Sequence, residues 1–352
     1  MARARARGEE IRRFIIEHVE KHPADISRKT AEKFGITRQA VNKHLQRLTG
    51  EKSLAQTGVT RNRSYKLAPL LEFRKEYLTA GLEEDVVWRN DVLPAIGKVP
   101  DNVRGIWEYG FTEMLNNALD HSEGTAITVH LKKTAATTEV IVLDNGVGIF
   151  AKLQKALGLL DERHAILELS KGKLTTDPKN HSGEGIFFSS RMFDEFDILS
   201  GGVFFSHQFG DEEDWILERQ AQKFGTMVWM KLHNHTARTT GKIFDRYASG
   251  EDYGFNKTVV PVKLAQYGNE NLISRSQAKR LLGRVELFKV VIFDFSEVSE
   301  IGQAFGDEIF RVFAQKHPDI QLTPMHANSA VKRMIERAKS GATAKAINPA
   351  DV

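Results

Sequence analysis

The stretch EMLNNALDHS at residues 113–122 places a carboxylate and a carboxamide four residues apart within a helical hydrophobic pattern. Because an α-helix has 3.6 residues per turn, Glu113 and Asn117 project from one face, and Asp120 joins them a turn later. The other sides carry Val103, Trp107, Phe111, Met114, Leu115 and Ala118. A polar face on a helix that is otherwise apolar predicts that this face lines a cavity, and therefore a site.

The composition is typical of a folded protein, and 352 residues suggest about two or three domains. No apolar run approaches the roughly eighteen residues that span a bilayer, and the start, MARARARGEE, has arginines with no apolar segment behind them. We therefore expect a cytoplasmic protein without a membrane partner. The absence of cysteine excludes disulfides, thiolate catalysis, zinc ribbons and iron–sulfur clusters.

The charge is unevenly distributed along the chain. Residues 1–67 contain 16 Lys and Arg against 7 Asp and Glu, whereas the remaining residues contain 34 against 39. This segregation predicts a polyanion as the partner of the N-terminal part alone.

Residues 1–69 follow the pattern of three short helices and a basic hairpin. Apolar spacing predicts a first helix over 9–21, Asp25 or Ser27 precedes a second that Gly35 ends, and Thr37 caps a third. The segment SLAQTGVTRNRSYKLAPL then alternates as a hairpin does. Over residues 8–68 the sequence resembles a winged helix-turn-helix domain.

That resemblance implies DNA binding, with the third helix in the major groove. Thr37 and four residues of this helix would face bases or phosphates, while Val41, Leu45 and Leu48 would face the core. The DNA-facing residues of the helix would be Arg38, Gln39, Asn42 and Lys43, and Arg61 and Arg63 of the wing would meet backbone phosphate. The alternative is a winged helix that serves only protein contacts or dimerisation.

The middle of the chain alternates between helical and strand patterns. We expect residues 70–100 to form a helical connector that ends at Pro94 and Pro100, followed by the helix that carries Glu113. Strand patterns lie at 126–133, 138–145, 195–209, 214–220 and 225–232, and a helix begins at GEGIFFSSRMF.

Four separated motifs fall in order along residues 101–240. They are Glu113-x-x-x-Asn117-Ala118, Asp144-Asn145-Gly146-Val147-Gly148, Gly183-Glu184-Gly185-Ile186, and Gly225-Thr226 at the start of a strand. In this order they resemble the boxes of the GHKL ATP-binding superfamily, which includes gyrase B, MutL, heat-shock chaperone ATPases, histidine kinases and anti-sigma kinases. The implied fold is an α/β sandwich whose mixed, mostly antiparallel sheet carries helices on one face.

The resemblance implies a role for each motif. Asn117 would bind Mg²⁺, which prefers oxygen ligands, with Asn116 a weaker second candidate, and Glu113 would act on a water aimed at the γ-phosphate. Asp144 would accept the adenine amino group, with support from Thr226. The remaining cofactor-binding residues would be Gly146 and Gly148 beside the base, and Gly183, Gly185 and Ile186 at a helix start suited to phosphates. We expect structural roles for His121 and Ser122.

No Walker sequence GxxxxGK[ST] occurs in the chain. Residues 150–182 would form a mobile ATP lid, in which one of Lys171, Lys173 and Lys179 would reach the γ-phosphate. Each of these lysines is also explained as an ordinary surface charge. The alternative for the whole set of motifs is a degenerate relative that no longer binds nucleotide.

Residues 255–340 form a separate α/β unit, with a tail over 341–352. The segment FDFSEVSEIGQAFGDEIFRVF at 293–313 resembles a STAS-like domain, the fold of anti-sigma factor antagonists. Those antagonists accept phosphate on a serine at the start of a helix, where this chain has Gly302, Gln303 and Ala304. We therefore expect docking or sensing of a protein partner rather than phosphorylation at this place.

These features predict a multidomain α+β protein that binds Mg-ATP and couples the nucleotide state to DNA binding and to transcriptional or signalling control. The resemblances to winged-helix proteins and to the GHKL superfamily both imply that the chain forms a homodimer. If the chain is an enzyme, an ATPase is the first expectation. The rival is a protein kinase of the anti-sigma or histidine-kinase type that acts on a separate partner, and a third reading is a protein-only scaffold.

Overall fold

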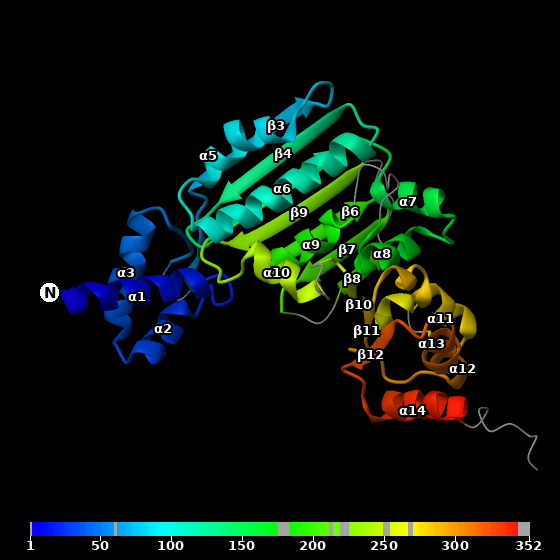
Figure 1. Cartoon of the computed structure of the whole chain (residues 1–352). Coiled ribbons are helices and arrows are strands. Elements are labelled where there is room, and N and C mark those ends of the chain that lie inside the picture. Colours follow the sequence, from blue (N-terminus) through cyan, green and yellow to red (C-terminus); the bar gives the residue numbers. More distant parts are fainter. Residues whose placement is uncertain are drawn as a thin grey trace, which may run out of the picture.

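The structure is a computed structural model that describes residues 2–59, 62–174, 183–210, 214–218, 225–248, 254–266 and 270–343. Three units follow one another along the chain, and the first and last lie at opposite ends of the central sheet (Figure 1). The fold is therefore multidomain, with mixed α and β structure.

The N-terminal unit consists of three helices and a two-stranded antiparallel sheet. Its elements are α1 (Ala2–His18), α2 (Ile26–Phe34), α3 (Arg38–Gly50), β1 (Leu54–Thr57) and β2 (Ser64–Leu67). The Thr37 side chain accepts a hydrogen bond from Ala40 N at 3.2 Å and so caps α3. Val41, Leu45 and Leu48 are buried, which confirms the predicted core face of this helix.

This unit rests against the turn that joins two strands of the central sheet. Leu70 N donates to Lys133 O at 2.7 Å, and Ala136 belongs to the N-terminal hydrophobic core. Lys231 approaches Glu20 to 4.0 Å from the neighbouring strand. The first two units are thus in direct contact.

The central unit is built on a seven-stranded sheet in which every strand pair is antiparallel. The strands, in their order across the sheet, are β3 (Leu71–Leu78), β4 (Ala126–Lys133), β5 (Thr137–Asp144), β9 (Thr226–His233), β6 (Glu195–Ser200), β7 (Val203–Gln208) and β8 (Asp214–Glu218). At the centre of the sheet β5 pairs with β9, although the two strands are not consecutive in the chain. Residues more than 80 positions apart in sequence therefore meet there.

The expectation that residues 70–100 form a helical connector is wrong for the first part of this segment. Residues 71–78 are strand β3, an edge strand that pairs with β4 over its whole length. Only Tyr77 of this strand is buried, because an edge strand faces solvent along most of its length. Helical structure follows only later, in α4 (Glu84–Val87), η2 (Trp88–Val92) and α5 (Leu93–Ile96).

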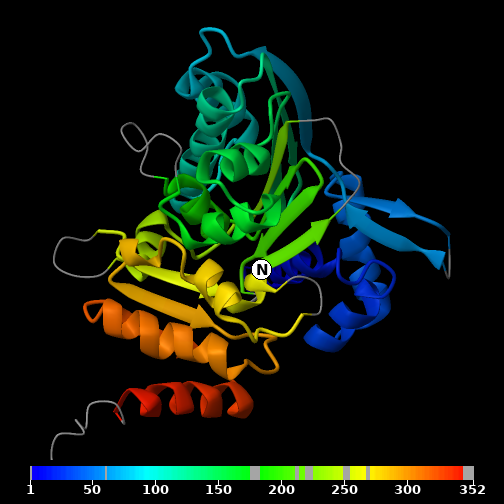
Figure 2. The same ribbon diagram turned by 90° about the vertical axis from the view of Figure 1, so that its right-hand side faces the viewer.

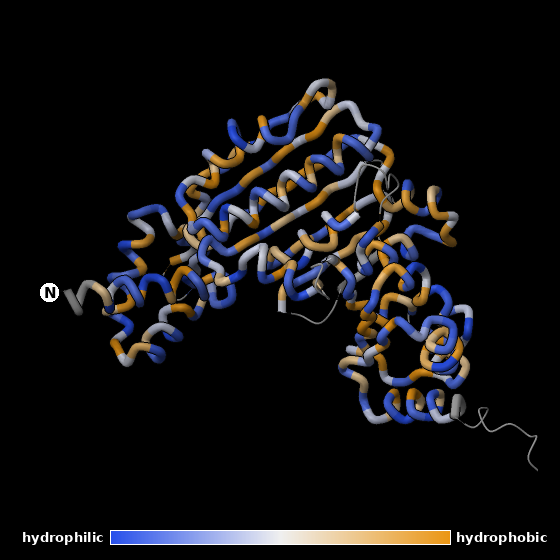
Figure 3. Tube along the Cα trace, viewed as in Figure 1, coloured by the Kyte–Doolittle hydropathy of each residue, from blue (hydrophilic) through white to orange (hydrophobic). Residues whose placement is uncertain are grey.

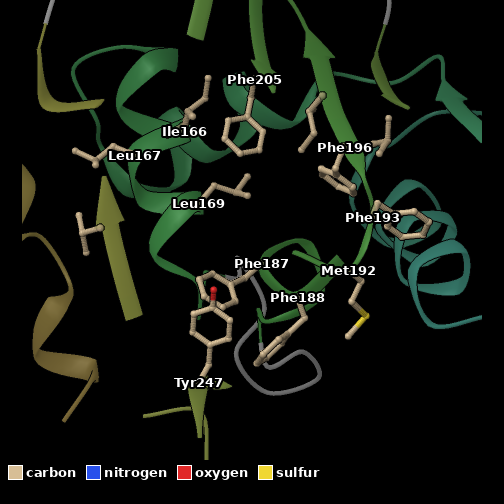
Figure 4. Close-up of a cluster of buried hydrophobic side chains, with 14 of the residues drawn as sticks. Ile166, Leu167, Leu169, Phe187, Phe188, Met192, Phe193, Phe196, Phe205 and Tyr247 are labelled. Carbon is tan, nitrogen blue, oxygen red and sulfur yellow. The ribbon is translucent and has the colours of Figure 1, made fainter. Parts of the chain in front are cut away.

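Helices cover one face of the sheet (Figures 1 and 2). They include α6 (Asp101–His121), α7 (Ile149–Leu157), α8 (Glu162–Lys171), α9 (Gly185–Met192) and α10 (Thr240–Tyr247). Trp107 and Phe111 of α6 are fully buried, and the rings of Trp107 and Phe193 meet edge to face at 4.8 Å. Figure 4 shows the core between α8, α9 and the strands, which is rich in phenylalanine.

The segment predicted as a mobile lid contains two helices, α7 and α8. Every residue from Ala165 to Lys171 is buried. The prediction of one long loop over 150–182 is therefore wrong for the residues of α7 and α8. Residues 175–182 lie outside the described part of the chain.

The C-terminal unit has a parallel sheet in the order β10-β11-β12. Its strands are β10 (Lys257–Pro261), β11 (Val290–Asp294) and β12 (Gln321–Met325), and its helical segments are η3 (Val262–Ala265), α11 (Arg275–Leu282), η4 (Val285–Leu287), α12 (Gln303–Asp307), η5 (Glu308–Phe313), α13 (Ala314–Lys316) and α14 (Ser329–Thr343). Hydrophobic and hydrophilic segments alternate along α14 in Figure 3. The apolar side includes Val331 and Ile335, which are buried, as an amphipathic helix requires.

Among the described residues, no helix has both the length and the hydropathy that a bilayer-spanning helix needs.

Asp197 is a buried carboxyl within the central sheet. It lies on β6 opposite Ser206 of β7 and Trp229 of β9, and its Oδ1 has no hydrogen-bond partner in the described part of the chain. Burial raises its pKa to about 6, although the Ser206 hydroxyl lowers it in part. The charged form is therefore unfavourable in the folded protein.

We predict that Asp197→Asn removes a pH dependence of stability. The folded pKa lies above the ordinary value of 3.8, so the stabilising effect of the protonated form is complete below about pH 4 and is lost as the pH rises through 6. At roughly 1.4 kcal/mol per pKa unit, the wild type should lose about 2 kcal/mol relative to the variant between pH 4 and pH 7.5. Urea unfolding of both proteins at the two pH values measures this difference, and a constant difference would contradict the assignment.

Candidate functional site

A cavity of about 250 Å³ lies between α6, the ends of β5 and β9, and helices α7, α8 and α9. It gathers predicted site residues from four separated parts of the chain. Those that line it are Glu113, Asn117, Asp144, Gly183, Gly185, Ile186 and Thr226. The expectation that the polar face of α6 lines a cavity is thus confirmed for its first two members, whereas Asp120 is exposed.

Asp144 is the best-fixed polar group of the cavity. It ends β5, is 4% exposed, and its Oδ1 accepts hydrogen bonds from Gly146 N at 2.8 Å and Thr226 N at 3.1 Å. Burial raises the pKa of this carboxyl, against the effect of those two backbone donors. A carboxylate held in one orientation at the cavity wall is suited to accept a hydrogen bond from a ligand amino group.

Thr226 joins three segments around this carboxylate. Its backbone N–H binds Asp144, and its Oγ1 accepts from Ile149 N at 3.0 Å. Gly148, with φ of 84°, provides the turn that leads into α7. Gly146 and Gly148 thus lie in the loop next to the cavity rather than among its lining residues.

Two glycines permit close approach at the cavity. A Cβ on Gly225 would lie 2.0 Å from Asp144 Oδ1, and a Cβ on Gly185 would lie 2.0 Å from Glu113 Oε2. Any larger residue would therefore displace one of the two carboxylates. Because Gly185 has no side chain, the start of α9 can lie directly against the Glu113 carboxylate.

Glu113 belongs to an acidic group at this end of the cavity. Burial raises the pKa of Tyr109, and the charges of Glu113 and Glu184 raise it further, which shows that both carboxylates lie near the phenol. Burial also raises the pKa of Glu184, while Lys173 opposes that rise. Asn117 contributes a buried Nδ2 without a hydrogen-bond partner among the described residues.

Sequence reasoning missed several residues of the cavity wall. His121, Ser122 and Lys152 line it, and Lys152 Nζ is held by His121 O at 2.8 Å and by Glu123 Oε1 at 2.9 Å. The four-residue spacing from Asn117 could have identified His121. The apolar walls come mainly from Met114, Ala118, Val142, Ile149, Leu153, Leu169, Phe187 and Val228. Asn116, the weaker metal candidate, is not among the lining residues.

Two of the three lysines predicted to reach a γ-phosphate, Lys171 and Lys173, bond other groups. Lys171 is 1% exposed and donates to Glu168 Oε1 at 2.7 Å and to Gly283 O at 2.6 Å. Lys173 Nζ donates to Leu287 O at 3.1 Å. Both lysines bind the C-terminal unit, and Lys179 lies outside the described residues.

The candidate DNA-contacting residues that the structure describes belong to α3 and to the segment before β2. Arg38, Gln39 and Lys43 are exposed on α3, and half-buried Asn42 lies beside Ser27. Arg63 precedes β2 and is half-buried. Arg61 lies outside the described residues.

No group of three or more His, Asp or Glu residues that could hold a metal ion occurs in the described ranges.

Comparison with known families identifies part of the chain. A model described as the STAS-like domain of unknown function (DUF4325) matches residues 277–332, which run from α11 into α14. The chain thus contains a C-terminal STAS-like domain, as the segment at 293–313 predicted. A search of curated proteins found no significant match to the sequence.

Proposed function

We propose that this chain is an ATP-binding regulator, in which the cavity beside α6 binds Mg-ATP in the manner of the GHKL superfamily. The observation that carries the proposal is the meeting of Glu113 and Asn117 of α6 with Asp144, Gly185 and Thr226 at one cavity, although these residues come from four separate segments. Such convergence is a stronger argument than the motifs themselves, because the motifs alone do not require spatial contact.

The cavity offers a suitable environment for each part of the nucleotide. The adenine would lie among apolar side chains such as Met114 and Val228, with its amino group donating to Asp144. The phosphates would lie toward Gly183 and the start of α9, where free backbone N–H groups favour anions. Asn117 would supply a side-chain oxygen to Mg²⁺, and the bound metal would neutralise phosphate charge.

Glu113 is the residue on which hydrolysis depends in this proposal. Its carboxylate lies against Gly185, at the side of the cavity assigned to the phosphates, where it would orient a water or accept its proton. The kinase alternative assigns the γ-phosphate to a protein acceptor instead. No hydroxyl stands at the start of α12, since Gly302 precedes Gln303 there, so an acceptor would come from a separate partner.

The N-terminal unit would bind DNA through α3. Arg38, Gln39 and Lys43 of this helix are exposed while Val41, Leu45 and Leu48 fill the core. The basic surplus of residues 1–67 supports a polyanion partner. We propose that nucleotide binding alters this DNA binding and that the active species is a homodimer. The STAS-like domain would receive a protein partner.

The proposed ATP site predicts that the protein binds nucleotide. Wild-type protein should bind a fluorescent ATP analogue in the presence of Mg²⁺, and Asp144→Asn should weaken binding at least about tenfold. The asparagine oxygen would stay with Gly146 N and Thr226 N, and the NH₂ group left to face the base cannot accept from its amino group. Fluorescence titration measures both affinities. Asp197→Asn is the matched control, since Asp197 is a buried carboxyl of the same sheet outside the cavity. Absence of binding by the wild type, or equal affinity of Asp144→Asn, would contradict the proposal.

A labelled-phosphate assay separates hydrolysis from phosphoryl transfer to protein. With γ-labelled ATP, the wild type should release free phosphate, and Glu113→Gln should reduce that release at least about a hundredfold while retaining nucleotide affinity. Label that stays on protein would instead support the kinase alternative.

The proposed role of the N-terminal unit predicts salt-dependent DNA binding. The protein should bind DNA with an affinity that falls as salt rises, and Arg38→Ala or Lys43→Ala should each reduce the slope of log K against log salt by about one. Arg28→Ala is the control, because Arg28 is engaged by Asp25 and Glu32 on α2. Electrophoretic mobility shifts over a salt series measure these slopes, and a protein that shifts no DNA at low salt would support the scaffold reading.

A further inference from the structure

The end of α8 and the residues that follow it are bonded to the C-terminal unit at Lys171 and Lys173. Thr258 Oγ1 of β10 donates to Lys171 O at 2.7 Å, and the Arg284 guanidinium donates to Lys173 O. In the opposite direction, Lys171 Nζ donates to Gly283 O and Lys173 Nζ to Leu287 O.

Aromatic packing reinforces this attachment. Gly172, with φ of 84°, lies so close to Phe255 that a Cβ there would be 2.7 Å from its ring. The Phe255 ring in turn packs on Phe187 at 4.6 Å and on Phe288 at 5.3 Å. Phe187 lines the cavity, whereas Phe288 belongs to the C-terminal unit, so one continuous cluster joins the two.

Residues on either side of the bonded segment form part of the cavity wall. Leu169 and Leu174 both line the cavity. Leu174 N also donates to Gly183 O at 3.1 Å, and Gly183 leads into α9. A displacement of residues 171–173 would therefore change both this wall and the start of α9, since packed interiors transmit small shifts.

We propose that Arg284 and Thr258 are positioning residues that hold the α8 side of the cavity in its ligand-binding shape, so that the C-terminal unit sets nucleotide affinity. The inference rests on the proposed function and identifies the contacts through which that site is regulated. Because coupling between two sites is reciprocal, nucleotide binding also protects this contact surface of the C-terminal unit from opening.

Arg284 has two properties that guide the choice of variant. Its φ is 61°, a region that asparagine tolerates better than alanine. Its guanidinium also lies 3.8 Å from Glu168 Oε2, and the Glu168 carboxylate keeps the Lys171 ammonium as a partner if Arg284 is replaced. Arg284→Asn therefore removes the bond to Lys173 O while adding little backbone strain.

The test is the double variant Arg284→Asn with Thr258→Val, in which the valine keeps the shape of the threonine and removes its donor. Affinity for the fluorescent ATP analogue should fall at least about fivefold, the lower end of ordinary coupling. Without nucleotide, backbone amides of α9 should exchange hydrogen faster in the variant, because the wall that supports the start of α9 is loosened. Arg311→Gln is the control, since Arg311 pairs with Asp307 inside the C-terminal unit.

The two readouts separate this inference from the proposed function. Wild-type binding with unchanged affinity and unchanged α9 exchange in the double variant would overturn the coupling and leave the ATP site intact. If the wild type binds no nucleotide but the amides of α9 still exchange faster in the double variant, the ATP assignment is overturned. The contact between the C-terminal unit and the α8 side of the cavity would nevertheless be supported. An effect of equal size in Arg311→Gln would also overturn the inference, because it would show a general loss of stability.

Discussion

The central constraint of this structure is that α6 must bury one side against the sheet and keep a carboxylate and a carboxamide on another. Trp107 and Phe111 meet the first requirement and are fully buried. Glu113 and Asn117 meet the second and line the cavity. The position of α6 determines where the cavity lies, and residues of β5, β9, α7, α8 and α9 form most of its other walls.

The cavity and the C-terminal unit depend on one another through the end of α8. Leu169 faces the cavity, while Lys171 forms a buried ion pair with Glu168 and reaches a backbone carbonyl of the C-terminal unit. Such a pair is costly to break, because the remaining charge would be buried alone. This arrangement explains why α8 is an ordered helix in a region whose glycines and lysines suggest a loop.

Much of the fold could be predicted from hydrophobic periodicity, but two parts could not. Strand β3 has the sequence LEFRKEYL, and as an edge strand it buries little, so the alternation that marks an inner strand is missing. The helices within 150–182 bury residues against distant segments, which local sequence does not reveal. The meeting of Asp144 with Thr226 was expected from the resemblance that the ordered motifs carry. The prediction for Lys171 failed because, besides nearby Glu168, its ammonium bonds two backbone carbonyls that lie over 100 residues away in sequence.

The most direct measurement of the central claim is a crystal structure with a non-hydrolysable ATP analogue and Mg²⁺. We expect the base amino group at Asp144, the phosphates at Gly183 and the start of α9, and the metal beside Asn117. An analogue bound elsewhere, or a cavity that remains empty at saturating analogue, would contradict it.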